Sequence, residues 1–435
     1  MNHDRDMVEA IKRVRAIAAD EAERLLREAS SVLRRSPSAF ATLEKAIRES
    51  VQGIGASILA DAVALGGNGY EGTSIGCVCG ARQKYMNDRE RSVISLLGKF
   101  RFRRAYYWCA KCSESSAPLD DAMSIAHTQF SPAVRNAVSL MGAEVAFGRG
   151  AMLMEELTGI RISKRKHREI SEATGARLGG PKIPPRRKRK GDRAVEDLYI
   201  STDGTMAPTL DAWREVKIGA IFEVRPDAHN RPERLRTHYL GDVMKAEDFG
   251  WELYRAADRM GLGQAKRTIV LGDGAAWIWN IADFHFPDAV QIVDWYHATE
   301  RLWIVANAHF TEGSDEARDW VSRCEKLLAA SRVETLIERL ERLRKQNARK
   351  KQVRKIIDEA IVYYRNNIER MRYRRYVRRG LFIGSGVIEA GCKHIVGQRL
   401  KQSGMRWALE GLTSILHLRL AVLNRQWPQQ NRAAA

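Results

Sequence analysis

The stretches LYISTDGT (198–205) and TIVLGDGAAW (268–277) decide the fold of this chain. Each contains a short apolar run that predicts a buried strand, bounded by turn-forming glycine. Each also places an aspartate where the apolar run ends, Asp203 in the first stretch and Asp273 in the second. If the two strands share a sheet, their aspartates can meet at one edge of it.

A third acid, Glu389, lies in GSGVIEAGCKH (384–394), which predicts a helix with glycines at its start and Ser385 as its cap. Carboxylate oxygens bind Mg²⁺ or Mn²⁺, and two such ions about 4 Å apart can stabilise both oxygens of a phosphodiester displacement. We therefore expect Asp203, Asp273 and Glu389 to be catalytic ligands of two Mg²⁺ or Mn²⁺ ions. Taken singly, each acid can equally be a turn residue or a surface charge.

The composition of the chain limits the number of its domains and the kind of partner it can bind. The chain has 435 residues, enough for two to four domains, and a formal net charge of +20. Such a charge favours a polyanionic partner, and nucleic acid is preferred over a membrane because no apolar run approaches the ~20 residues that span a bilayer. The N-terminal residues lack the apolar core of a signal peptide. We expect a cytoplasmic protein whose six cysteines are reduced.

The first domains are predicted to be helical and then cysteine-rich. Residues 1–68 form an N-terminal helical region, either a hairpin for dimerisation or DNA contact or a plain packing element. Residues 69–125 carry C-x-C and C-x-x-C pairs separated by a strand-like stretch, which predicts a zinc ribbon. Its ligands to a structural Zn²⁺ are Cys77, Cys79, Cys109 and Cys112; free thiols in a hairpin are the alternative.

Basic residues upstream of residue 196 predict contacts with double-stranded DNA. Arginines alternate with aromatic residues in the predicted ribbon strand. Residues 126–180 predict a helix-turn-helix domain whose second helix is capped by Ser163. Residues 181–195 form a basic linker. Helix pairs of this kind are also common as pure structure. The predicted DNA-binding residues are Arg101, Arg103, Arg104, Lys164, Arg165, Lys166, Arg168, Arg186, Arg187, Lys188, Arg189 and Lys190.

The remaining residues predict an α/β domain interrupted by helices. Three strands, a helix, a strand, a helix and a strand are expected within residues 196–297, and this order is that of an RNase H-like sheet. Residues 298–380 predict a charged helical insertion. Residues 381–435 then supply the second part of the core, with the Glu389 helix and a C-terminal helix. The fold class is therefore multidomain α+β.

Further residues are expected to support the site. Asp294 and His297, in D-W-Y-H, can orient the site or a DNA strand, although Asp294 can also simply cap a helix. Lys393 can reach the scissile phosphate or pair with Glu389 one turn earlier. A basic face beyond Glu389 is expected to contact the DNA backbone through Arg399, Lys401 and Arg406.

Several of these motifs together resemble a known family. The segments STDGT, LGDGAAW, DWYHATE and GSGVIEAGCKHIVGQRLKQSGMRW, behind the two cysteine pairs, are similar to the Kra-type insertion-sequence (ISKra) transposases of bacteria. The resemblance covers nearly all of the chain from about residue 70. It implies a DDE transposase with an RNase H-like core, in which Asp203, Asp273 and Glu389 are the metal-binding triad. Asp294 and His297 match the D-x-x-H element of Mutator-like and hAT-like relatives.

We thus expect a nucleoid-associated DNA transposase that cuts at transposon ends and joins the freed 3′-OH to target DNA. Its partners would be the terminal inverted repeats, the target DNA and at least one further copy of itself. Two alternatives stay open. One is a structure-selective nuclease on the same core without strand transfer, and the other is a zinc-ribbon DNA-binding regulator without catalysis.

Overall fold

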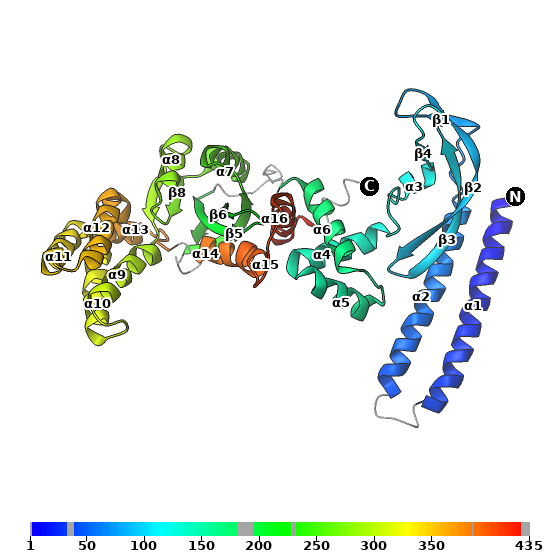
Figure 1. Ribbon diagram of the computed structural model, residues 1–435, viewed down its shortest axis with the longest axis horizontal. Coiled ribbons are helices and arrows are strands. Elements are labelled where there is room, and N and C mark those ends of the chain that lie inside the picture. Colours follow the sequence, from blue (N-terminus) through cyan, green and yellow to red (C-terminus); the bar gives the residue numbers. More distant parts are fainter. Residues whose placement is uncertain are drawn as a thin grey trace. The chain divides into compact units, whose positions relative to one another are not determined.

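The computed structural model describes residues 2–32, 39–180, 195–227, 229, 232–384 and 386–427. The protein is a mixed α+β protein with two sheets (Figure 1). It divides into two compact units, residues 1–171 and residues 172–433, each of which is considered by itself below. Within the described residues, no helix is long and apolar enough to cross a membrane.

The first unit begins with two long helices, α1 (Asn2–Val32) and α2 (Ala39–Leu65), which pack side by side (Figure 1). Both lie within the N-terminal region that the sequence predicts to be helical. Arg13 Nη2 lies 2.8 Å from Asp61 Oδ1 and ties one helix to the other. Ala10 of α1 and Ala56 of α2 are buried.

A four-stranded antiparallel sheet follows, in the order β1 (Ser74–Gly76), β2 (Arg82–Ser95), β3 (Gly98–Trp108) and β4 (Ser115–Ser116). The turn between β2 and β3 needs glycine, because Gly98 has φ +103. Along β3, Phe100 and Phe102 point inward while Arg101 and Arg103 point to solvent, the alternation that a half-buried strand requires. The apolar face packs against α2.

The first unit continues with the helices α3 (Pro118–Ala122), α4 (Pro132–Glu144) and α5 (Phe147–Thr158), and α6 (Lys164–Leu178) begins in the first unit and ends in the second. Their boundaries have identifiable caps. Ser131 Oγ accepts a hydrogen bond from the Val134 N–H at the start of α4, and Gly159 ends α5 in the left-handed conformation. The predicted cap of the basic helix is confirmed, since Ser163 Oγ accepts from the Lys166 N–H at 3.1 Å.

The second unit contains a five-stranded sheet in the order β7-β6-β5-β8-β9. Strands β5 (Asp197–Pro208), β6 (Trp213–Pro226) and β7 (Pro232–Asp242) are antiparallel, whereas β8 (Arg267–Gly272) and β9 (Val290–Val293) run parallel to β5. Helix α7 (Ala246–Met260) precedes β8 and α8 (Ala276–His285) precedes β9. All of these elements lie where the sequence predicts them.

Helices cover both faces of this sheet. A Cβ on Gly219 of β6 would lie 2.8 Å from the Leu253 side chain, so α7 lies against the face to which Gly219 turns. Neighbouring Ile218 pairs with Asp203 and turns to the opposite face. That face receives α14 (Gly386–Cys392), which packs on β5 and β6 and whose Cys392 bonds to Asp203.

A run of helices separates β9 from α14: α9 (Trp295–His309), α10 (Asp315–Ala329), α11 (Val333–Gln346), α12 (Lys351–Asn366) and α13 (Tyr373–Arg378). The chain then returns to the sheet. Phe382 N–H donates to the Tyr199 hydroxyl at 2.9 Å, and Trp295 N–H donates to the Ile383 carbonyl at 2.8 Å. After α14 come a π-helical turn (Lys393–Gly397), α15 (Gln398–Leu400) and α16 (Leu409–Leu423).

Candidate catalytic and metal sites

Three aspartates form a row at one edge of the five-stranded sheet. Ser201 of β5 pairs with Leu271 of β8, and Leu271 pairs with Ile292 of β9. Two residues further along these three parallel strands come Asp203, Asp273 and Asp294, which we call the aspartate row. Side chains two residues apart on a strand turn to the same face, so strand register alone brings the three carboxylates to neighbouring positions.

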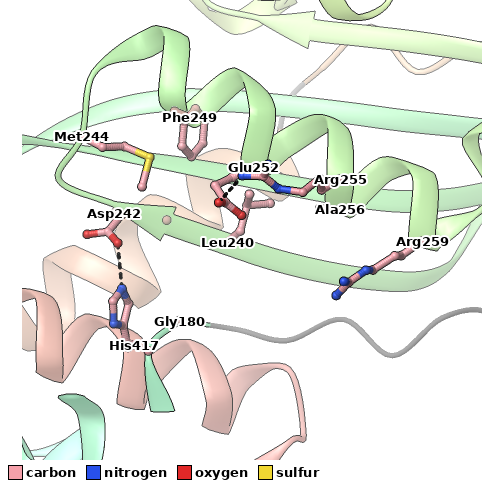
Figure 2. A pocket seen from close by; sticks show the side chains of 12 residues that line it. Gly180, Leu240, Asp242, Met244, Phe249, Glu252, Arg255, Ala256, Arg259 and His417 are labelled. Atoms are coloured by element: carbon pink, nitrogen blue, oxygen red, sulfur yellow. Dashed lines mark hydrogen bonds and ion pairs between the residues drawn. The ribbon is translucent and has the colours of Figure 1, made fainter. Parts of the chain in front are cut away.

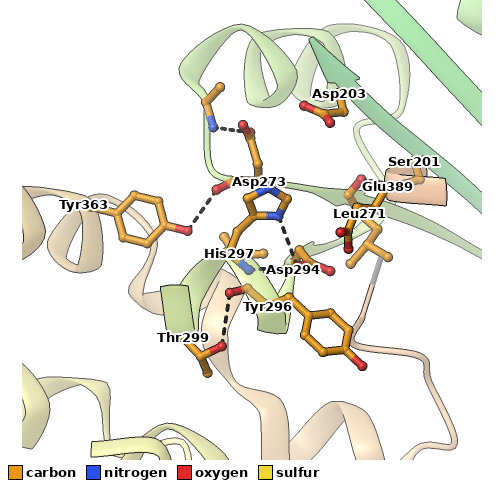
Figure 3. Close-up of polar contacts among 12 residues, drawn as sticks. Ser201, Asp203, Leu271, Asp273, Asp294, Tyr296, His297, Thr299, Tyr363 and Glu389 are labelled. Carbon is orange, nitrogen blue, oxygen red and sulfur yellow. Dashed lines mark hydrogen bonds and ion pairs between the residues drawn. The ribbon is translucent and has the colours of Figure 1, made fainter. Parts of the chain in front are cut away.

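The Asp273 loop is held by its own backbone and by the helical insertion. The Asp273 carboxylate accepts a hydrogen bond from the Ala275 N–H at 2.8 Å, and Gly274 has φ +103 (Figure 3). Tyr363 of α12 donates its hydroxyl proton to the Asp273 carbonyl at 2.8 Å. A Cβ on Gly274 would lie 2.5 Å from the Tyr363 ring, so the ring and the loop are in close contact.

Asp294 both caps a helix and orients a histidine. Its Oδ1 accepts from the His297 N–H at 2.9 Å, at the start of α9, and lies 3.1 Å from His297 Nδ1 (Figure 3). The Asp294 side chain is fully buried. The hydrogen bond to Asp294 and the negative charges of Asp294, Asp273 and Asp203 raise the pKa of His297 to about 9. Asp294 therefore has the capping role that the sequence allows, and its carboxylate also favours the protonated form of His297 beside the aspartate row.

Asp203 lies closest to the helix that carries the third acid. Burial and the negative charge of Asp273 raise the pKa of Asp203 above its usual range. The carboxylate accepts hydrogen bonds from the Gly204 N–H, at 2.7 Å, and from the Cys392 thiol. The negative charge of Asp273, which disfavours ionisation of Asp203, would also attract a cation to this place.

Glu389 approaches this edge from α14, on a different segment of the chain (Figure 3). Its Oε1 lies 2.7 Å from Lys393 Nζ, so of the two predicted roles of Lys393 the structure has the ion pair. The carboxylate oxygens of Asp203, Asp273 and Glu389 are not gathered to metal-ligand spacing; among the described residues only the cysteine group discussed below meets that criterion. Ser385, the predicted cap, lies outside the described residues.

Two residues of this site were missed by reasoning from the sequence. One is Cys392, which is buried and bonds to Asp203. Its position three residues after Glu389 places both on one side of α14, and that spacing is a usable signal. Tyr363 has no such signal, because only the tertiary fold brings α12 to the Asp273 loop.

The four cysteines of the first unit form a second site. Cys77 and Cys79 lie in the turn between β1 and β2, and Cys109 and Cys112 follow β3. The Sγ–Sγ distances are 3.5 Å for Cys77–Cys112, 3.5 Å for Cys77–Cys79 and 3.7 Å for Cys79–Cys109. All four sulfurs lie within 4.8 Å of one another, so the group could hold a metal ion.

The local backbone favours the thiolate form of Cys77, which is the form that binds a metal ion. A hydrogen bond from the Cys79 backbone amide lowers the pKa of Cys77 to about 6. Gly80 completes the first turn with φ +79. By contrast Cys324, on α10, is a buried thiol outside this group.

The predicted DNA-binding residues fall into exposed and buried groups. The exposed group includes Arg101 and Arg103 on β3, Lys164, Arg165, Lys166 and Arg168 on α6, and Arg406; Lys401 is half-buried. Arg165 and Lys166 both pair with Glu169, and Lys401 Nζ donates to the Thr205 hydroxyl at 2.6 Å. The linker residues Arg186, Arg187, Lys188, Arg189 and Lys190 lie outside the described residues.

Two of these predictions are wrong. Arg104 follows Phe100 and Phe102 at the strand period of two, so it turns inward, and its Nε lies 2.7 Å from Oδ2 of buried Asp120. Arg399 is 0% exposed and its guanidinium lies over the Trp407 ring, 5.1 Å from the centroid. The π-helical turn after α14 shifts the helical face, which turns Arg399 into the core.

A cavity of about 270 Å³ opens elsewhere in the second unit, between β7, α7 and α16 (Figure 2). Asp242 and His417 meet at its wall, with Oδ2 and Nε2 2.9 Å apart. Glu252, Arg255 and Arg259 line it from α7. The cavity contains none of the residues predicted for catalysis.

Comparison with known proteins gives one result. No curated protein matches the chain. A family model described as "Uncharacterised protein family (UPF0236)" matches residues 38–432, which include the first unit from α2 onward, nearly all of the second unit, the aspartate row and all four clustered cysteines. The chain belongs to this uncharacterised family.

Proposed function

We propose that the protein is a DNA transposase of the DDE class, whose second unit is an RNase H-like catalytic domain. One observation carries the proposal: strand register aligns Asp203 and Asp273 on adjacent parallel strands, and α14 returns after the insertion to bring Glu389 against β5. The strand order, with three antiparallel strands followed by two parallel ones, supports an RNase H-like sheet. The resemblance of the same segments to Kra-type transposases points to the same chemistry.

The donor set fits a divalent metal ion. Asp203, Asp273 and Glu389 offer only oxygen ligands, as Mg²⁺ and Mn²⁺ prefer. Burial and the negative charge of Asp273 raise the pKa of Asp203, and a bound cation would relieve the second of these effects. When bound, two such ions would supply Lewis acidity to the attacking and leaving oxygens. Two contacts within the chain bear on this binding. The ion pair between Lys393 and Glu389 must break before Glu389 can bind a metal ion, and the contact with Asp294 favours a proton on His297 beside the site.

The first unit is proposed to recognise DNA. The Sγ–Sγ distances of 3.5 to 3.7 Å agree with the edge of a tetrahedron of thiolates around Zn²⁺; a Zn–S bond of about 2.3 Å gives an edge of about 3.8 Å. Helices α5 and α6 would act as a helix-turn-helix, with exposed Lys164 and Arg168 near the start of the second helix. Terminal inverted repeats and target DNA in the bacterial nucleoid would be the partners.

The catalytic assignment is tested by three isosteric substitutions. Asp203→Asn, Asp273→Asn and Glu389→Gln each keep the size of the side chain and remove a charged ligand. We expect each variant to lose cleavage of end-containing DNA in Mg²⁺ or Mn²⁺ and to keep its affinity for that DNA in a gel-shift assay. Asp283→Asn, on exposed α8, is the matched control that should cleave normally. Near-normal cleavage by any of the three variants would refute the assignment.

A specific observation favours a second candidate, the non-catalytic zinc-ribbon regulator. Among the described residues it is the cysteines, and not the three acids, that lie at metal-ligand spacing. The regulator would bind DNA with steep salt dependence, would be indifferent to Mg²⁺ and would never cleave. A structure-selective nuclease would cleave but fail to join a pre-cut 3′ end to a plasmid, so this joining assay separates it from a transposase.

A further inference from the structure

The turn between α11 and α12, within the helical insertion, concentrates positive charge that none of the sites above uses. Residues 342–357 contain eight lysines and arginines and no aspartate or glutamate. Two of the eight are paired, Arg344 with Asp358 and Lys355 with Glu359. The other six are exposed and form no ion pair with any described residue. We call these six the basic turn: Arg342, Lys345, Arg349, Lys350, Lys351 and Arg354.

The basic turn is held on a fixed scaffold. Asn347 lies within it and is buried. Its Nδ2 donates to the Leu343 carbonyl at 2.8 Å and lies 3.0 Å from Nδ1 of His309, the last residue of α9. Leu343 and Ile357 are buried where α11 packs against α12. Charged side chains on an anchored turn lose less conformational freedom on binding than charges on a loose segment.

This arrangement of charge is unfavourable in the free protein. Helix α12 begins at Lys351, follows Lys350 as its N-cap residue and has no acidic residue in its first turn. The N-terminus of a helix carries partial positive charge, so these lysines oppose the helix dipole as well as repelling one another. Among the described residues no ion pair to the basic turn offsets this repulsion. A bound polyanion would offset it.

The side chains around the basic turn suit the backbone of double-stranded DNA. Unpaired bases are bound by stacking on aromatic side chains, and residues 342–357 contain none. A membrane surface is bound with the help of exposed apolar side chains. The larger apolar residues of this segment are instead buried or half-buried: Leu343, Val353, Ile356 and Ile357. Exposed lysines and arginines alone are what contact with phosphate groups requires.

Helix α12 connects the basic turn to the candidate catalytic site. Lys351 is its first residue, and Tyr363 near its other end donates to the Asp273 carbonyl at 2.8 Å. From residue 351 to residue 363 the helix extends about 18 Å at 1.5 Å per residue. At 3.4 Å per base pair this distance corresponds to about five base pairs of duplex. A duplex that lies at the aspartate row is therefore long enough to reach the basic turn.

We infer that the basic turn binds the phosphate backbone of double-stranded DNA on the flank of the candidate catalytic site. This adds a DNA contact within the insertion, where none of the DNA-binding residues predicted from the sequence lies. The inference rests on the proposed binding of DNA by this protein, but not on the assignment of the three acids. Because the contact is with phosphate groups, it is independent of base sequence.

The test measures the affinity of the full chain for a duplex of random sequence across a range of salt concentrations, without divalent metal. Arg349→Ala, Lys350→Ala and Lys351→Ala are combined in one protein. We expect weaker binding and a slope of log affinity against log salt that is lower by up to about 2.7, since each phosphate contact contributes about 0.9.

A matched control removes the same charge elsewhere in the insertion. Arg323→Ala, Lys326→Ala and Arg332→Ala, combined, replace three exposed basic residues on α10 and at the start of α11, which is the end of that helix away from the basic turn. This protein has the same net charge as the first variant. Its slope should equal that of the unaltered protein, so a difference between the two variants reports the position of the charges.

Unfolding in urea separates a binding role from a structural one. The variant of the basic turn should unfold at a higher urea concentration than the unaltered protein, because repulsion at the start of α12 is removed. A lower midpoint would mean that these charges stabilise the fold, and would overturn the argument for a partner.

The outcomes distinguish this inference from the proposed function. An unaltered protein that does not bind duplex DNA would refute both. Binding with an unchanged slope in the variant of the basic turn, or an equal fall in both variants, would refute the inference alone. Loss of binding to phosphatidylserine vesicles, with the duplex slope unchanged, would assign the basic turn to a membrane surface instead.

Discussion

At the scale of single residues, neighbouring charges, burial and hydrogen bonds determine which groups of the candidate site carry a charge. The hydrogen bond to Asp294 raises the pKa of His297, which favours its protonated form. Burial and the negative charge of Asp273 raise the pKa of Asp203. Cys392 donates a hydrogen bond to Asp203 from the helix that carries Glu389. The site therefore balances negative charge with an imidazolium and a thiol proton, and binding of a metal ion would have to compete with both.

Tyr363 is the residue whose removal tests whether the insertion positions the site. Tyr363→Phe deletes the hydrogen bond to the Asp273 carbonyl, and we expect the free energy of unfolding to fall by about 1 kcal/mol. Because the Asp273 loop is then less restrained, the Mn²⁺ concentration for half-maximal cleavage should rise. Cleavage is measured across a Mn²⁺ titration and stability by chemical denaturation.

The adjacent residue supplies the control for this prediction. Buried Tyr364 also donates to a carbonyl, that of Ala298 at 2.6 Å, which lies on α9 and not on the Asp273 loop. Tyr364→Phe should cost a similar free energy of unfolding and leave the Mn²⁺ requirement unchanged. An identical Mn²⁺ titration for Tyr363→Phe and the unaltered protein would exclude a positioning role for Tyr363.

At the scale of elements, strands and helices follow the local sequence pattern closely, and the two wrong predictions have different causes. The five strands of the larger sheet lie at the predicted positions because their apolar runs and flanking turns are unambiguous. Arg104 was misassigned although it keeps the two-residue period of Phe100 and Phe102, which already predicts that it faces the core. Arg399 could not be placed this way, since a π-helical turn precedes it and nothing local signals that turn.

The small sheet should depend on its cysteine group. Cys109→Ser replaces a fully buried ligand, so we expect loss of bound zinc and faster proteolysis within residues 74–116. Cys324→Ser, at an equally buried thiol on α10, should keep the zinc content of the unaltered protein. Zinc content is measured on purified protein by atomic emission; full zinc in Cys109→Ser would contradict the proposed ligand set.

Strand β7 carries a histidine that should make the fold sensitive to acid. Burial, with the nearby charge of Arg236, lowers the pKa of His238 to about 4. Below pH 6.5 this histidine is protonated in the unfolded chain, whereas in the folded chain it stays neutral until about pH 4. The free energy of unfolding therefore falls as the pH falls from 6.5 to 4. The full cost is about 3 kcal/mol.

Replacing that histidine checks the sign and the source of the effect. His238→Leu should flatten the dependence of unfolding free energy on pH between pH 6.5 and 4, as measured by denaturant titrations across the window. His229→Leu, at an exposed position, should leave the slope as it is. An unchanged slope in His238→Leu would assign the acid sensitivity to other groups.

At the scale of the whole molecule, the net charge of +20 predicts a polyanionic partner but does not say which charges meet it. Burial removes Arg104 and Arg399 from that set, and ion pairs engage others such as Arg165 and Lys166. The neighbouring positions of Asp203 and Asp273 were predictable from strand order, because parallel neighbours share an edge. The insertion's contact with the Asp273 loop was not, because it depends on how helices distant in sequence pack.

The salt dependence of the affinity for DNA measures how many basic side chains contact phosphate groups. Each phosphate contact contributes about 0.9 to the slope of log affinity against log salt. Lys164→Ala with Arg165→Ala should therefore lower the slope by up to about 2 if both contact phosphate. Lys266→Ala, an exposed lysine paired with Glu196, is the matched control and should not change the slope. Equal slopes for all three proteins would exclude α6 from the DNA interface.

The helical insertion has a consequence for synthesis of the protein. Asp203 and Asp273 precede it in the chain, and Glu389 follows it. A ribosome therefore completes the sheet and the entire insertion before the last acid emerges. In a transposase as proposed above, a product truncated after the insertion but before residue 389 would contain the DNA-binding residues without the full set of acids. Such fragments would bind DNA ends without cutting them and would compete with the intact protein.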